Sequence, residues 1–195
     1  MNENFFPKDG GVTIDVPWNR RPEPMDGTYD IKRLDVSIVL TQETRWELPP
    51  LSEETADRLK ESGWPREVIR DIGSEAEAGI YEGAELEPKE VNGKPALVRT
   101  DIDPAQKDAM DMTNLERMQS GRAPLDENGK PIELHHIGQR QDSCLAELTL
   151  SEHRGAGNDN VLHNKLQEST IDREGFAAER SQHWKARAAD FKVGE

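Results

Sequence analysis

The chain of 195 residues has a mass of 22.0 kDa, which is enough for one ordinary domain, or for one domain with an appendage. Hydrophobic and charged residues each make up 33% and the formal net charge is −14, so a large apolar core is excluded. We expect neither a membrane span nor a signal peptide, because no apolar run approaches the roughly 20 residues that cross a bilayer and the N-terminus has no basic start. The single cysteine excludes an intrachain disulfide.

The first part of the chain is the most acidic. Residues 1–120 hold fifteen basic and twenty-six acidic residues, a net charge of −11, whereas residues 121–195 have a net charge of −3. Six prolines interrupt the first fifty residues, and we expect one strand there, at about Leu34–Leu40. We therefore predict an acidic, proline-rich N-terminal extension over residues 1–60 and a main domain over residues 61–195.

Three short helices and a hairpin are expected next. Ser52 and Ser74 are suited to cap two helices, and Pro65 suits the first turn of a helix between them. Glycines separate the three helices, which we place at about residues 53–61, 65–72 and 75–84. Residues 86–99 read as two strands joined by Asn92-Gly93, the pair typical of a type I′ turn.

The remaining elements are short until the last one. Thr113 or Asn114 can cap a helix over residues 115–119, which Gly121 ends. A second hairpin-like stretch at residues 126–131 leads into a strand over residues 132–137. The elements expected after it are a strand at residues 145–150 and a helix at residues 171–191.

All five histidines lie in the last 61 residues, and four of them fall within 29 residues. Histidine is the commonest metal ligand and the usual general base near neutral pH. His135 and His136 are adjacent, so on a regular strand their side chains would point to opposite faces. At the end of a strand both can border one cleft, one as a metal ligand and the other as the group that activates a water.

His153 and His163 lie ten residues apart, which would place them about 80° apart around a straight helix. The glycine-rich residues between them make one straight helix improbable, and a bent connection could bring both back to His135. Three imidazoles and a water would suit zinc, nickel or manganese, whereas magnesium prefers carboxylates. The alternative is that the adjacent pair, His135 and His136, is not a site and that the other two lie at the surface or beside a helix cap.

The stretch Glu133-Leu-His-His136, followed by Gly138-Gln139 and then Asp142-Ser143-(x)-Leu-Ala-Glu-Leu-Thr149, resembles the LHH nucleases of the HNH/endonuclease VII superfamily. These nucleases are toxin domains of bacterial polymorphic toxin systems. The resemblance runs from about Trp64 to Phe191 and includes the Asn92–Arg99 hairpin and His183-Trp-Lys-Ala-Arg187. Residues 1–60 resemble no family that we can name.

The resemblance implies an α+β fold with a ββα-metal nuclease core, flanked by short helices and hairpins, with its metal site at residues 132–164. It assigns metal binding to His135, His153 and His163, and the general base to His136. Colicin-type DNases share the Glu-Leu-His-His string, which implies a supporting catalytic role for Glu133. The chain departs from the family in having Glu147 where a strand asparagine is expected, so the residue that orients the base stays open, with Asn158 and Asn160 in a nearby loop.

The histidine cluster and the resemblance together predict a metal-dependent endonuclease, most simply a DNase, and the resemblance implies that it acts as an antibacterial toxin. Arg154 is expected to contact phosphates, and Arg140 flanks the same stretch. The implied cofactor is one divalent ion, with zinc or nickel bound and magnesium or manganese possible for activity. The implied partners are DNA, a cognate immunity protein and a larger secretion system that delivers the domain into the cytoplasm of a target cell. The sequence does not decide whether the substrate is DNA or RNA.

Two other functions remain possible from the sequence: a catalytically inactive metal-finger module of a larger effector, and a metal-free acidic adaptor. Three further features have a simple structural explanation. Cys144 is expected to be a small buried side chain, and His183 a packing or surface residue. The acidic stretch Asp101–Asp111 lacks the central glycine and the closing glutamate of an EF-hand, so it predicts turns and caps.

Overall fold

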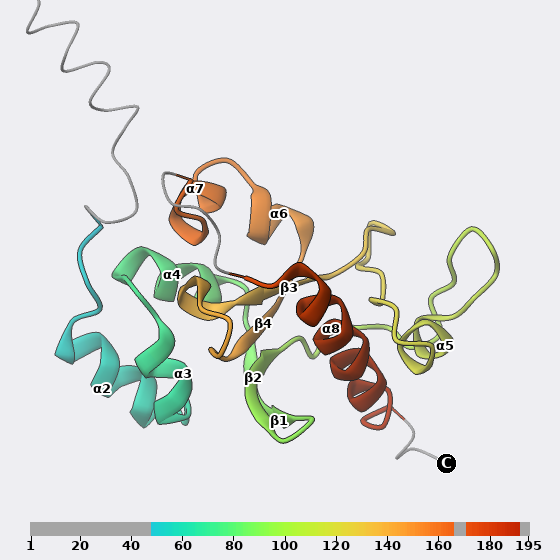
Figure 1. Ribbon diagram of the computed structural model, residues 1–195, viewed down its shortest axis with the longest axis horizontal. Coiled ribbons are helices and arrows are strands. Elements are labelled where there is room, and N and C mark those ends of the chain that lie inside the picture. Colours follow the sequence, from blue (N-terminus) through green and yellow to red (C-terminus); the bar gives the residue numbers. More distant parts are fainter. Residues whose placement is uncertain (1–47, 166–170, 192–195) are drawn as a thin grey trace, which may run out of the picture. The chain divides into compact units, whose positions relative to one another are not determined.

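The computed structural model describes residues 48–165 and 171–191, which belong to one compact unit (Figure 1). The strand predicted at Leu34–Leu40 lies outside the described residues. The described part contains helices and one four-stranded sheet, which confirms the predicted α+β class. No helix in the described part is long and apolar enough to cross a membrane.

The three predicted N-terminal helices form as α2 (Glu53–Glu61), α3 (Arg66–Asp71) and α4 (Glu75–Gly83). The hydroxyls of Ser52 and Ser74 accept hydrogen bonds from backbone N–H groups of the first turns of α2 and α4, so both predicted caps are confirmed. Helix α2 lies before the domain boundary that we predicted at residue 60. Its Leu59 is nevertheless buried in the same core as residues far beyond that boundary. The packed part of the chain therefore begins earlier than residue 61.

The sheet is built from two hairpin-like pairs of strands. β1 (Glu87–Val91) and β2 (Lys94–Val98) pair antiparallel, and positive φ angles at Asn92 and Gly93 confirm the predicted type I′ turn. β3 (Glu133–His136) and β4 (Leu145–Leu148) also pair antiparallel, and β4 runs parallel to β2. The strand order is β1-β2-β4-β3. β3 is therefore an edge strand, so side chains from both of its faces can reach the same side of the molecule.

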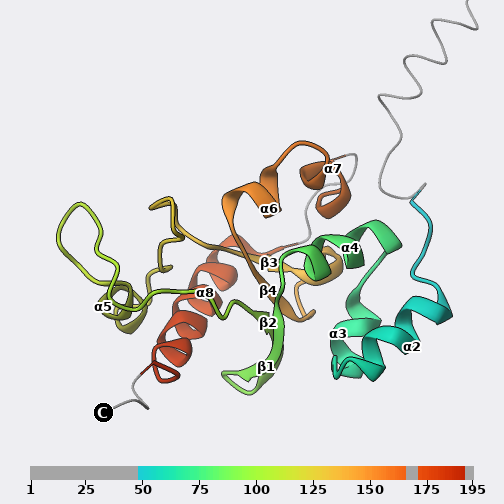
Figure 2. The same ribbon diagram turned by 180° about the vertical axis from the view of Figure 1, so that it is seen from behind.

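Helices cover both faces of the sheet (Figures 1 and 2). Apolar residues of α2, α3, α4 and α7 (Asn158–Leu162) share one core cluster with Leu97, Ala146 and Leu148 of the strands. On the other face, α5 (Asn114–Gln119) and α8 (Arg173–Arg187) share a second cluster with the strands. The predicted cap at Thr113 is confirmed as a capping box, and Gly121 after α5 has a φ of 80°. The sheet is thus buried on both sides.

A buried carboxylate ties α8 to the centre of the sheet. Oε1 of Glu147 on β4 accepts hydrogen bonds from Nε2 of His183 at 2.7 Å and from Nε of Arg187 at 2.8 Å. Its other oxygen accepts the backbone N–H of Arg99 at 2.9 Å. Glu147 is fully buried, and so it is part of the scaffold that positions α8. His183 is buried, which selects packing from the two alternatives expected for it, packing or surface.

The acidic stretch before α5 forms turns rather than a calcium loop. Asp103 accepts the backbone N–H of Ala105, and Asp108 accepts those of Met110 and Met112. Asp108 also pairs with Arg117 of α5 at 2.6 Å. The prediction of turn and cap chemistry is confirmed.

Candidate active site

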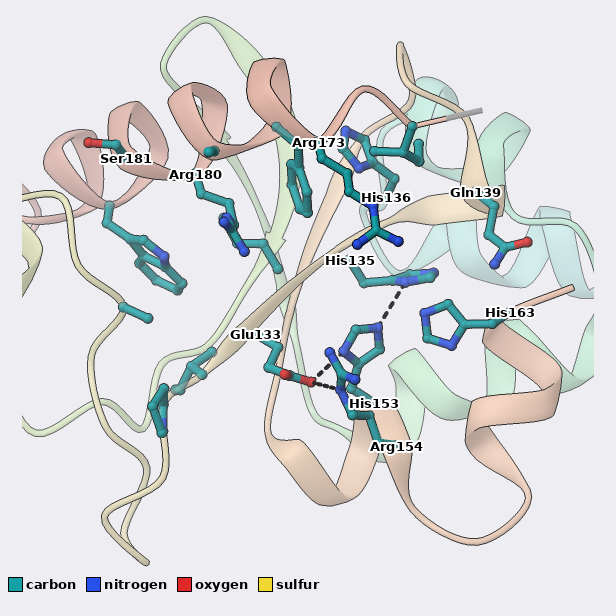
Figure 3. A pocket seen from close by; sticks show the side chains of 18 of the residues that line it. Glu133, His135, His136, Gln139, His153, Arg154, His163, Arg173, Arg180 and Ser181 are labelled. Atoms are coloured by element: carbon teal, nitrogen blue, oxygen red, sulfur yellow. Dashed lines mark hydrogen bonds and ion pairs between the residues drawn. The ribbon is translucent and has the colours of Figure 1, made fainter. Parts of the chain in front are cut away.

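Three histidines from separate elements converge in one pocket (Figure 3). His135 lies on β3, His153 lies in the last turn of α6 (Leu150–Arg154), and His163 directly follows α7. One ring nitrogen from each lies within 4.8 Å of the other two, and Nδ1 of His135 is 3.1 Å from Nε2 of His153. The structure therefore brings together the three residues that the sequence proposed as metal ligands.

A sharp break between α6 and α7 explains how residues ten positions apart can meet. Thr149 begins α6 with a capping box, and Gly155 ends the helix after only five residues. Gly157 then adopts a φ of 92°, a conformation that favours glycine, and α7 starts in a new direction. This is the bent connection that we expected between His153 and His163.

Carboxylates fix two of the three rings. Nδ1 of His153 lies 2.7 Å from Oε2 of Glu133, and Nδ1 of His163 lies 2.9 Å from Oδ1 of Asp159. Burial acts to raise the pKa of Glu133, but hydrogen bonds from Arg154 and His153 outweigh it and lower that pKa. An ionised carboxylate only accepts hydrogen bonds, so both Nδ1 atoms must carry the proton. The lone pairs of His153 and His163 then lie on Nε2.

The donor set fits a divalent transition ion. Carboxylates that orient histidine rings in this way are typical of metal ligands. Burial lowers the pKa of His153, which favours the neutral ring that a metal requires. Two nitrogens bound to one tetrahedral ion lie roughly 3.3 Å apart, close to the 3.1 Å that separates His135 from His153. Three imidazoles would leave a fourth position for water or substrate, whereas a closed structural site takes four protein ligands.

His136 projects from the opposite face of β3. Its Nε2 lies 2.9 Å from Oε2 of Glu179 on α8, and its ring packs against Phe176 with 4.5 Å between centroids. Burial lowers the pKa of His136. Glu179 acts to raise this pKa, and the nearby Lys94 acts to lower it further. The ring is therefore neutral at neutral pH. Because β3 is an edge strand, His136 borders the same pocket as His135 even though their side chains diverge.

Two carboxylates at the site were missed from the sequence. Glu179 is the partner of His136, and the partly buried Lys94 of β2 lies 3.1 Å from its other oxygen. Glu77 on α4 is fully buried, accepts the backbone N–H of Gly138 at 2.8 Å, and lies 4.0 Å from Nε2 of His135. Each lies more than forty residues from the histidine that it approaches, so only tertiary packing reveals either contact.

The two arginines that we singled out are both held by carboxylates. Nε of Arg154 donates to Oε2 of Glu133 at 2.7 Å, so Arg154 and His153 share one carboxylate. Arg140 pairs with the buried Asp71 and still lines the pocket. Cys144 is buried nearby, as predicted, and burial together with Asp71 raises the pKa of its thiol to about 12. A thiol of this kind is a poor metal ligand at neutral pH.

The structure also gives contacts for two of the three residues that we considered as orienting groups for the base. The carboxylate of Glu147 accepts hydrogen bonds from His183 on α8 and from the backbone N–H of Arg99. Nδ2 of Asn158 donates to the backbone oxygen of Glu152. All six predicted site residues line the same pocket: Glu133, His135, His136, His153, Arg154 and His163.

Residues 113–190 match the model of the LHH family, described as a nuclease of the HNH/ENDO VII superfamily with conserved LHH. The matched segment includes Leu134-His135-His136 and both later histidines of the cluster. No solved structure matches the chain. We expected the resemblance to begin near Trp64, whereas the matched segment begins at residue 113. The resemblance of the residues between these two positions stays a prediction.

Proposed function

We propose that the chain is a metal-dependent endonuclease that hydrolyses phosphodiester bonds in DNA, because residues 113–190 match the model of the LHH nuclease family. One observation carries this proposal: a three-histidine cluster suited to a metal ion shares a pocket with a fourth, neutral histidine that a carboxylate holds in place. A purely structural metal finger has no use for that fourth histidine.

Hydrolysis of a phosphodiester needs an attacking water, a base that takes its proton, and positive charge near the phosphate. An ion held by His135, His153 and His163 would supply the positive charge for the scissile phosphate and for the leaving oxygen. His136 is the base. Glu179 is a hydrogen-bond acceptor at Nε2, so Nε2 carries the proton and Nδ1 has the lone pair that receives the proton of the water.

In this proposal Glu133 acts through His153. It holds the ring with Nδ1 protonated and keeps Nε2 available for the ion, and it draws Arg154 toward the same place. Arg154 is more than half exposed, which leaves its guanidinium accessible to a phosphate. Glu133 is therefore a positioning residue, and the residues that meet the reacting atoms are His136 and, through phosphate, Arg154.

The proposal is tested by incubating the purified chain with supercoiled plasmid and divalent ions, with and without a chelator. We expect nicking that the chelator abolishes and that zinc, nickel, manganese or magnesium restores to different extents. Plasmid that stays intact with every ion would contradict the nuclease proposal and would favour an inactive metal-finger module.

Metal removal should also lower thermal stability. A ligand that binds only the folded chain stabilises it by RT ln(1 + [L]/Kd), about 2.7 kcal/mol at a hundredfold excess over Kd. Adding zinc or nickel to metal-free protein should therefore raise Tm by several degrees. The control is His153→Ala, in which the shift should shrink. Equal melting temperatures with and without every divalent transition ion would contradict a metal site in this cluster.

Glu179 should be needed for turnover rather than for binding. Glu179→Ala is expected to lower kcat roughly 10- to 100-fold, by analogy with the loss that follows when a carboxylate that orients a metal-ligating histidine is removed. KM and metal affinity should change little. Glu179→Gln, whose amide oxygen can still accept from Nε2, should recover part of the rate. The matched control is Glu174→Ala, an exposed carboxylate at the start of the same helix; an equal loss in both alanine variants would refute the assignment.

We also propose that the nuclease is an antibacterial toxin that acts in the cytoplasm of a target cell, delivered by a larger secretion system and neutralised by a cognate immunity protein. The resemblance of residues 133–149 to toxin domains supports this role. Growth arrest on expression in a bacterial cytoplasm, relieved in His136→Ala, is the expected result; normal growth with active enzyme present would contradict it.

A further inference from the structure

The pocket around the histidines carries a charge opposite to that of the chain. It has a volume of about 1210 Å³, and among the residues that the structure describes its lining includes one carboxylate, Glu133, which is paired with Arg154. The basic residues that line it are Arg122, Arg140, Arg154, Arg173 and Arg180. The whole chain has a formal net charge of −14, so positive charge is concentrated here while the rest of the molecule is strongly negative. A polyanion would be repelled elsewhere and attracted to this pocket.

The five arginines are not equivalent. Arg140 is held by Asp71 and Arg154 by Glu133, as described above. Within residues 48–165 and 171–191, no carboxylate pairs with Arg173, Arg180 or Arg122, and all three are exposed. An arginine that no carboxylate neutralises keeps its donors and its charge for a ligand. These three are therefore the basic groups of the pocket that no carboxylate of the described residues neutralises, and they add to the accessible guanidinium of Arg154.

Arg173 and Arg180 lie on one face of α8. They are seven residues apart, which is nearly two full turns, so they are separated by about 10 Å along the helix. Between them on the same face are Phe176 and Ala177, which also line the pocket. Figure 3 shows both arginine side chains extending from α8 into the pocket, with Arg173 on the side of the three histidines. Helix α8 thus presents a basic row along one wall.

This row passes directly by the proposed base. The guanidinium of Arg180 lies 5.0 Å from the centre of the Phe176 ring, and that ring packs against His136 at 4.5 Å. At the other end of the row, α8 approaches Gly121, the residue before Arg122: Oγ of Ser181 lies so close that a Cβ added to Gly121 would be 2.2 Å from it. The order along the helix is therefore Arg173, Phe176 beside His136, Arg180, and then Ser181, which lies against the residue before Arg122.

We propose that this face of α8 binds the sugar–phosphate backbone of a nucleic-acid strand, with Arg173 and Arg180 contacting phosphates on either side of the scissile one. The inference rests on the proposed nuclease function and specifies where its substrate lies. A separation of about 10 Å corresponds to the rise of about three nucleotides along the axis of B-form DNA, so both arginines can meet the same strand when α8 lies roughly along that axis. Phosphate contacts position a substrate without reading its sequence, so cleavage guided by this face has little sequence preference.

The test measures binding and cleavage separately. Binding is measured in a His136→Ala background, which prevents turnover, with a labelled DNA duplex and an RNA duplex of the same sequence, over a series of salt concentrations. Arg173→Gln and Arg180→Gln should each reduce the slope of log affinity against log salt by about 1, because each removes one phosphate contact. In the otherwise unaltered chain, each should raise KM for plasmid nicking with little change in kcat or in metal affinity.

Arg66→Gln is the matched control, since Arg66 is exposed on α3, outside the pocket, and the substitution changes the net charge equally. A reduced slope in the two α8 variants, with DNA alone or with both duplexes, supports the inference when Arg66→Gln is unchanged. Unaltered slopes in both α8 variants, or an equal reduction in Arg66→Gln, overturn it.

The outcomes also separate this inference from the nuclease proposal. If the α8 variants nick plasmid as well as the unaltered chain, the nuclease proposal stands and the inference that Arg173 and Arg180 bind phosphates is wrong. If the unaltered chain nicks no plasmid but binds nucleic acid, and the α8 variants lose this binding, the inference about α8 stands and the nuclease proposal is wrong.

Discussion

Replacing His136 by alanine is expected to lower plasmid cleavage by roughly 10²–10⁴-fold, the usual contribution of general-base catalysis. The reason is that His136 is neutral, is held by Glu179, and borders the three-histidine cluster without belonging to it. Metal binding should survive, because the three ligands are untouched. Cleavage is measured by plasmid nicking, and metal affinity by calorimetry on the same preparation.

His135→Ala is the contrasting variant, because it removes a residue of the cluster itself and should lower metal affinity and cleavage together. In a calorimetric titration with metal, His136→Ala should therefore bind the ion normally, whereas His135→Ala, at the adjacent position, should bind it more weakly. If His136→Ala loses the metal and His135→Ala keeps it, the two roles are exchanged. If both variants nick at the full rate, the nuclease proposal is wrong.

Glu147→Ala should destabilise the fold by about 3–5 kcal/mol, the cost typical of breaking a buried ion pair. The substitution leaves the buried guanidinium of Arg187 without its main counter-charge and removes the acceptors of His183 and of the Arg99 backbone N–H. Burial alone would lower the pKa of Arg187, and Glu147 is the largest of the contributions that raise it instead. Urea unfolding of metal-free protein measures the loss.

The control for this prediction is Glu82→Ala, which breaks an exposed pair with Arg58 and should cost less than about 1 kcal/mol. Glu147→Gln keeps the shape and part of the hydrogen bonding, so it should lie between the two and provides a folded variant if Glu147→Ala does not fold. Similar losses for Glu147→Ala and Glu82→Ala would show that the network around Glu147 contributes little to stability.

Most local structure could be predicted from the sequence, because it depends on neighbours in the chain. Ser52, Ser74 and Thr113 cap their helices with hydroxyls that reach a backbone N–H three residues later. Asn92-Gly93 forms the turn of the first hairpin because both residues tolerate positive φ angles. The set of histidines was identified in the same way, from residue type, spacing and the string at residues 133–136.

The partners of these histidines could not be predicted from the sequence. Alternation along a strand showed that His135 and His136 diverge, but not that β3 would be an edge strand, and this position lets both border one pocket. Glu147 looked like a candidate to orient the base, yet strand pairing buries it against α8. The carboxylate that lies against His136 is Glu179 instead, because α8 packs back over the sheet.

The sequence by itself therefore determined the helix caps, the turns, the α+β class and the histidine set, since each follows from short-range geometry and residue chemistry. Tertiary structure alone decided which carboxylate holds which histidine and where the positive charge gathers. Net charge is a sum over the chain and is negative here, whereas the potential in a pocket depends on which side chains the fold places around it. Packing of α8 beside β3 places Arg173 and Arg180 at that pocket, on a chain whose composition argues against binding a polyanion.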